Sequence, residues 1–81
     1  MEIETMELFD ALKILEFGQV LVQVNNVAEG YGYHQEGTIV FWNKDKRGIL
    51  TGYTTGQEIL IGKPLEGDVA RYVIKNISDI N

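Results

Sequence analysis

The chain of 81 residues has the length of one domain, spanning residues 1–81, and contains no cysteine, one histidine and a formal net charge of −5. The lack of cysteine excludes disulfides, thiolate catalysis and thiolate metal sites. With a single histidine, a metal site would consist largely of oxygen ligands. We therefore expect no metal and no cofactor. A domain of this size buries only about 60–65 % of its unfolded surface, which favours a homo-oligomer.

The charge is unevenly distributed along the chain. Residues 1–36 carry one lysine against seven carboxylates, whereas residues 37–81 carry six cations against five carboxylates. The acidic half is a poor surface for long nucleic acid, and the second half suits a small anion. No apolar run is long enough to span a membrane, and the first residues are acidic, unlike a secretory signal. We expect a soluble, cytoplasmic protein with no membrane partner.

The first two predicted elements are a helix and a strand. Leucines recur at helical spacing within residues 5–17, Thr5 is suited to the N-cap, and Gly18 is suited to the C′ position after the helix. In residues 19–25 the hydrophobic pattern changes to a period of two residues, which places three valines on one side of a strand. We expect an amphipathic helix, followed by a strand whose valine side receives the helix or the core.

The central part of the chain is predicted to be a hairpin. Residues 26–36 contain two glycines and no clean period, so they form a loop or a loop with a short irregular strand at Tyr31 and Tyr33. Residues 38–42 and 49–53 alternate with period two and are rich in β-branched and aromatic side chains. The polar residues between them end in glycine, which is typical of a hairpin connection.

Two more strands are predicted after the hairpin. Residues 58–61 are ended by Gly62 and by Pro64, which cannot donate to a ladder, and residues 69–75 follow a turn. Residues 76–81 are expected to be frayed or a short edge. The short connections exclude parallel crossovers. We predict the α+β class: an N-terminal amphipathic helix packed on a small, curved, meandering antiparallel sheet or barrel of about five strands.

No catalytic set is apparent in the sequence. His34 lies near two glutamates and Tyr33, but a lone histidine in a loop is more often structural or exposed. The segment 30–33 lacks the strand-loop-helix setting and the Lys-Ser/Thr ending of a phosphate loop. We therefore expect that the protein is not an enzyme.

Binding has better candidates in this sequence. Tyrosines and the single tryptophan can stack on flat ligands, although Trp42, Tyr53 and Tyr72 would equally suit the core and its rim. An arginine can meet a phosphate, and amides and hydroxyls in turns can donate and accept hydrogen bonds. The predicted ligand-binding residues are Asn25, Asn26, Tyr31, Tyr33, Tyr53, Thr54 and Arg71.

The segment Phe9-Asp-Ala11-Leu12-Lys-Ile-Leu15-Glu-Phe-Gly18, with the strand after it, resembles the start of small phage proteins in the Thoeris anti-defence type 2 family. The resemblance covers residues 9–24. It implies a helix on an antiparallel sheet, self-assembly, and sequestration of a cyclic nucleotide-derived immune signal without turnover. Residues 23–26 stand where that family has a basic residue and a tryptophan, and Arg71-Tyr72 only echo its closing Asp-Trp strand.

Residues 37–74 are similar to the cold-shock domain, a five-stranded barrel of the OB type. Gly37-Thr-Ile-Val-Phe41-Trp-Asn resembles its first strand, and residues 56–61 and 65–69 resemble its third and fourth. The nucleic-acid face differs, because residues 46–51 lack the stacking aromatics, which supply about 1–3 kcal/mol per base.

The leading hypothesis is a non-enzymatic phage or mobile-element protein in the host cytoplasm, which sequesters a small nucleotide-like signal. Two alternatives remain. One is an acidic inhibitor that docks its helix on a host protein. The other is an OB-like binder of single-stranded nucleic acid, which the missing aromatics and the net negative charge disfavour.

Overall fold

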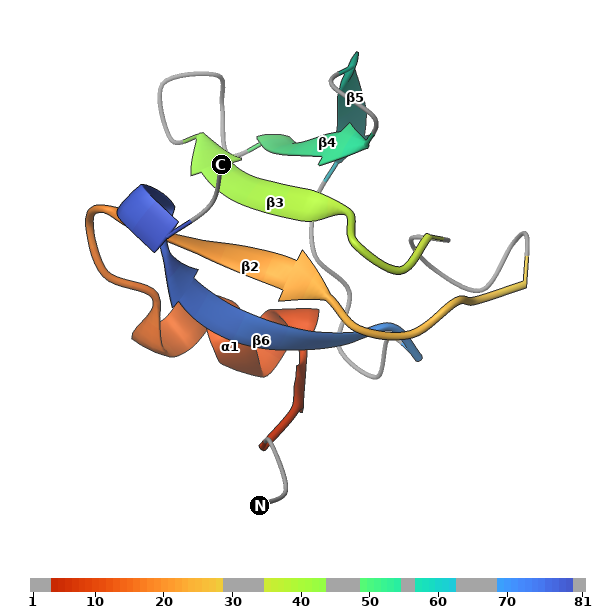
Figure 1. Cartoon of the computed structure of the whole chain (residues 1–81), viewed down its shortest axis with the longest axis horizontal. Helices are drawn as coiled ribbons and strands as arrows, with labels where there is room; N and C mark the ends of the chain where they lie inside the picture. The colour runs from red at the N-terminus through yellow and green to blue at the C-terminus, as the bar shows by residue number, and fades with distance from the viewer. Residues whose placement is uncertain (1–3, 29–34, 44–48, 55–56, 63–68, 80–81) are drawn as a thin grey trace.

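The computed structural model describes residues 4–28, 35–43, 49–54, 57–62 and 69–79. They form a short helix on one side of a curled antiparallel sheet (Figure 1). The α+β class is confirmed, with six strands instead of about five. The elements are β1 (Met6–Glu7), α1 (Leu8–Ile14), β2 (Gln19–Gln23), β3 (Ile39–Asn43), β4 (Ile49–Thr54), β5 (Gln57–Gly62), β6 (Arg71–Asn76) and the 3-10 helix η2 (Ile77–Asp79).

The strands do not follow a simple meander. Their order is β1-β6-β2-β3-β4-β5, and every pairing is antiparallel. The last strand therefore crosses back to lie between the first two, where the predicted meander would have placed it beside β5. Within the described residues no pairing joins β1 to β5, so the sheet is curled but open.

The predicted hairpin is confirmed as β3 and β4, and its connection lies outside the described residues. Ile39 pairs with Tyr53 and Phe41 pairs with Thr51 across it. The next pair, β4 and β5, contains a register shift that leaves Ile61 as an extra residue on β5. Ile61 leans over Gly52, where a Cβ atom would overlap the isoleucine side chain. The glycine therefore lets β5 curl over the sheet.

The helix starts later than the sequence predicts. Residues 6–7 are not its first turn but strand β1, which pairs with Tyr72 and Arg71 of β6. Glu7 occupies the N-cap position and makes no side-chain capping hydrogen bond. The prediction of Thr5 as N-cap was wrong. It was based on local helix signals, which cannot show that Met6 and Glu7 pair with a strand far along the chain.

The helix also ends earlier than predicted. Leu15 is already extended, with φ −67° and ψ 128°, so Gly18 is not the C′ residue of α1. Gly18 has a φ of 85° and lies in the turn that leads into β2. A positive φ is easily adopted only by glycine, which explains the residue type at this position. The turn that contains Gly18 starts β2 and does not cap α1.

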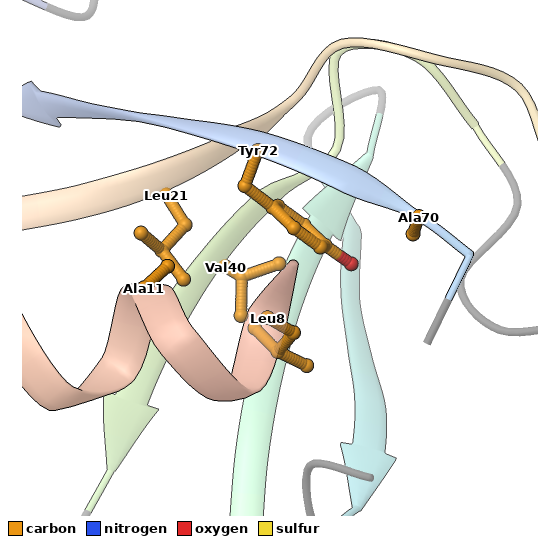
Figure 2. Packing of buried hydrophobic residues seen from close by; sticks show 6 residues of the cluster. All are labelled: Leu8, Ala11, Leu21, Val40, Ala70 and Tyr72. Carbon is orange, nitrogen blue, oxygen red and sulfur yellow. The ribbon is translucent and has the colours of Figure 1, made fainter. Parts of the chain in front are cut away.

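The helix packs on the face of β2 that carries Leu21 and Gln23, not on the valine face. Figure 2 shows Leu8 and Ala11 of α1 facing Leu21, Val40 and Tyr72 of the sheet. The expectation that the valine side of this strand receives the helix was wrong, although Val20 is buried on that side. The buried cluster consists of Leu8, Ala11, Leu21, Val40, Ala70 and Tyr72.

The C-terminal part is more ordered than the sequence suggests. Strand β6 covers residues 71–76, two residues later than predicted at its start. The sequence predicts a frayed or edge segment over residues 76–81; residues 77–79 form η2, and residues 80–81 lie outside the described residues. The N–H of Ile77 donates to the carbonyl of Gly18 at 2.8 Å, which joins η2 to the turn after α1. Among the described residues, no helix is long and apolar enough to cross a membrane.

Candidate functional site

Asn25 and Arg71, both predicted to bind ligand, lie beside each other and are bonded within the fold. The Asn25 Oδ1 atom accepts a hydrogen bond from the Arg71 N–H at 2.8 Å, and its Nδ2 atom donates to the Val69 carbonyl at 3.2 Å. The N–H of Val24 donates to the Arg71 carbonyl at 2.9 Å. The asparagine side chain thus extends the pairing of β2 with β6 beyond the last regular ladder position.

The Arg71 side chain holds the N-terminal segment against the sheet. Its Nη2 atom donates to the Thr5 carbonyl at 2.8 Å, and its Nε atom donates to the Thr5 Oγ1 at 3.3 Å. Hydrogen bonds from a charged donor are stronger than neutral ones. The guanidinium therefore fixes the segment that enters β1, and these bonds occupy donors that a phosphate would need.

Replacing Asn25 by alanine is expected to lower the free energy of unfolding by about 1–3 kcal/mol, because a half-buried N–H of Arg71 loses its acceptor. Asn26→Ala is the matched control, because Asn26 is exposed and makes one hydrogen bond with the backbone. We expect a smaller loss for the control. Urea unfolding followed by circular dichroism measures both, and equal losses would show that Asn25 has no special structural role.

Asn26 belongs to the base of the loop between β2 and β3. Its Oδ1 atom accepts from the Glu36 N–H at 2.9 Å, and the Gly37 N–H donates to the Gln23 carbonyl at 2.7 Å. The Thr38 Oγ1 donates to the Gln35 carbonyl at 2.8 Å. These bonds close the base of the loop.

Several predictions fall outside the described residues. Tyr31, Tyr33 and His34 lie in residues 29–34, which the structure does not describe. Thr54 lies in β4, and its side chain is likewise outside the described part. Their place in a ligand site stays a prediction.

Tyr53 lies on the face of the sheet opposite α1, which we call the distal face. Its ring packs edge-to-face against Phe41, with centroids 5.0 Å apart and an interplanar angle of 87°. Both rings are half-buried. Alternation along the strands and their register place Thr51 and five aliphatic side chains on the same face: Val20, Val22, Ile39, Leu60 and Val73.

The Thr51 hydroxyl is unusual on this face. Thr51 is 3 % exposed, and its Oγ1 atom is buried with no hydrogen-bond partner among the described residues. It lies directly across from Phe41 in the β3–β4 pairing. A buried hydroxyl without a partner costs about 1–3 kcal/mol, and because this atom has almost no exposed surface, a ligand can bond to it only where the packing over it opens.

Among the described residues, the cation closest in register to Phe41 is Lys75 and not Arg71. Two strands, β2 and β3, lie between Tyr53 and β6, so Arg71 and Lys75 of β6 are both at least about 14 Å from Tyr53 at normal strand spacing. Lys75 of β6 is exposed and pairs with Val20, so it lies on the distal face. Only β2 separates it from the strand of Phe41, a distance of about 10 Å.

The sequence reasoning missed Phe41 and Thr51. Both could be found by pairing the hairpin around its polar connection, which puts Phe41 opposite Thr51 and next to Tyr53. The lack of a partner for Thr51 has no signal in the sequence, since it depends on the packing around the strand. Among the described residues there is no group of three or more histidine or carboxylate residues placed to hold a metal ion.

Comparison with known proteins gives no relative from which a function could be transferred. No protein-family model matches the chain, and no curated protein or solved structure matches it significantly. The chemistry of the distal face therefore stands on its geometry alone.

Proposed function

We propose that this protein is a non-enzymatic phage or mobile-element protein that binds and sequesters a small nucleotide-like signal and so counters a host defence. The Phe41–Tyr53 pair beside the buried, unpartnered Thr51 hydroxyl supports this proposal. An aromatic surface with a polar group at its edge suits a planar heterocycle, whose faces are apolar and whose rim carries donors and acceptors.

The distal face supplies each part of the ligand with a partner. The base packs against the Tyr53 ring, and after displacing the packing that buries Thr51 its polar rim gives the Thr51 hydroxyl the hydrogen bond that it lacks. A phosphate then extends across β3 and β2 toward Lys75, whose strand lies about 14 Å from the strand of Tyr53. This arrangement revises the predicted site, because Tyr53 remains while Lys75 takes the role first assigned to Arg71.

Sequestration without turnover is part of the proposal. The biological setting rests on the resemblance of residues 9–24 to the Thoeris anti-defence type 2 family.

The test is to incubate the purified chain with cyclic nucleotides, remove free ligand, denature the protein by heat and analyse the released material. We expect the intact nucleotide. Release of a hydrolysed product would overturn the non-enzymatic assignment, and no uptake of any nucleotide would overturn the proposal.

Binding of a short single-stranded oligonucleotide should be compared with binding of a mononucleotide. An aromatic pair on an open sheet also suits single-stranded nucleic acid, but a net charge of −5 opposes a polyanion. We expect weaker binding of the oligonucleotide than of a mononucleotide at physiological salt. Tighter oligonucleotide binding would favour the OB-like alternative instead.

Thr51→Val is expected to have opposite effects on folding and on binding. Valine keeps the shape and removes the buried hydroxyl, so the free energy of unfolding should rise by about 1 kcal/mol. Nucleotide affinity should fall by about 2- to 10-fold, because one hydrogen bond to the ligand is lost. Thermal unfolding and isothermal titration measure the two effects. An unchanged affinity would remove Thr51 from the site.

A further inference from the structure

One end of the molecule exposes three apolar side chains from separate segments. Phe17 is 107 % exposed in the turn after α1, Ile14 is 59 % exposed at the end of α1, and Ile77 is 49 % exposed in η2. Figure 1 shows η2 (blue) beside the connection from α1 to β2 (orange). We call Ile14, Phe17 and Ile77 the end patch. Grouped apolar side chains of this kind mark interaction sites, whereas single ones need no explanation.

Hydrogen bonds hold the backbone of the end patch in place. The Gln19 N–H donates to the Glu16 carbonyl at 3.0 Å, and the Glu16 N–H donates to the Gln19 Oε1 at 2.9 Å. The Ile77 N–H donates to the Gly18 carbonyl at 2.8 Å. The turn is therefore closed on both sides of Phe17 and tied to η2. An aromatic side chain presented on a fixed turn binds with little further loss of entropy.

The charges around the end patch distinguish between kinds of partner. Lys13 and Glu16 flank its first part in the sequence, and Lys75 and Asp79 flank Ile77, giving two charges of each sign. Lys13 also pairs with Asp10 at 3.6 Å. A strongly basic or acidic partner would be matched by a rim of one sign. A rim of both signs can complement itself across a two-fold axis, as an isologous interface requires.

We propose that the end patch is a self-association surface that takes a second copy of this chain, related by a two-fold axis. The chain as a whole carries −5, so two copies repel each other on average and approach most easily where the charges balance. A standard interface takes about 800 Å² from each partner, roughly a seventh of the 5789 Å² surface. Three apolar side chains with a charged rim supply less, so the dimer is weak.

The test is sedimentation velocity on the full chain from about 10 µM to about 1 mM, where interfaces below the standard size associate. We expect the mass to rise from 9.1 kDa toward twice that value. Phe17→Ser should weaken association at least tenfold. Leu60→Ser is the matched control, because Leu60 is an exposed apolar residue on the edge strand β5, which β2, β3 and β4 separate from β6, the strand that leads into η2.

Ile77→Ser is a second variant that probes the patch from η2, and circular dichroism checks that all three variants keep the fold. We expect it to weaken association as Phe17→Ser does. A wild-type chain that stays at 9.1 kDa over the whole range would overturn the proposal. Association that persists in Phe17→Ser but is lost in Leu60→Ser would place the interface at β5 and overturn it too.

Discussion

Leu21→Ala is expected to lower the free energy of unfolding by about 2–5 kcal/mol, the range for removing a leucine from a packed core. Leu21 is fully buried at the centre of β2, in the cluster that joins α1 to the sheet. A domain of this size has a total stability near the lower end of about 5–15 kcal/mol. The variant should therefore keep at most about 3 kcal/mol of stability and unfold at a much lower denaturant concentration than the wild type.

Leu60→Ala is the matched control for this prediction, because it makes the same chemical change at a side chain that is 67 % exposed. Its expected loss is below about 1 kcal/mol. Guanidinium unfolding of the two variants beside the wild type gives the comparison. Similar losses at both positions would mean that the helix does not pack on the Leu21 face of the sheet.

Tyr53→Ala is expected to weaken nucleotide binding by about 5- to 150-fold, since a stacked base contributes about 1–3 kcal/mol. The change also removes the contact with Phe41, which is worth about 0.5–1.5 kcal/mol, so the protein should be less stable but folded. Tyr53→Phe keeps the ring and should retain most of the affinity. Isothermal titration measures the dissociation constants.

Phe17→Ala serves as the control for loss of an aromatic ring elsewhere. Phe17 is exposed at the end patch, and it lies outside the proposed ligand site. Its affinity for nucleotide should equal that of the wild type. A Tyr53→Ala variant that binds as tightly as Phe17→Ala would remove the aromatic pair from the site.

The sequence predicted the elements whose signals are local. The alternation in residues 38–42 and 49–53 and the polar connection between them led to the correct hairpin, β3 and β4. The same reasoning located β5, and it located β6 to within two residues at its start. Period-two patterns depend on neighbouring side chains, so they can be read without knowing the rest of the fold.

The errors arose where a distant part of the chain decides the structure. Met6 and Glu7 are compatible with a helix, but they pair with β6, about 65 residues away in the sequence. The choice of face on β2 was wrong because both sides are partly apolar, and only the position of α1 decides between them. Alternation alone cannot show which side of a strand receives the helix.

The candidate site was predicted in part. Tyr53 was selected for its ring and lies on the distal face, but Asn25 and Arg71 are bonded to each other and to neighbouring segments. Residue type identified groups capable of binding, whereas the bonds of Asn25 join residues 46 positions apart in the sequence. Such pairings depend on strand order, which the sequence did not reveal.

The most direct test of the account is an NMR titration of the isotope-labelled chain with cyclic nucleotides, which follows side-chain and backbone signals together. If the distal face holds the ligand, the signals of Phe41, Thr51 and Tyr53 should shift with one shared dissociation constant. Those of Leu8 and Ala11, on the helix side of the sheet, should stay unchanged. Shifts confined to the helix side, or no shifts with any nucleotide, would contradict the proposed site.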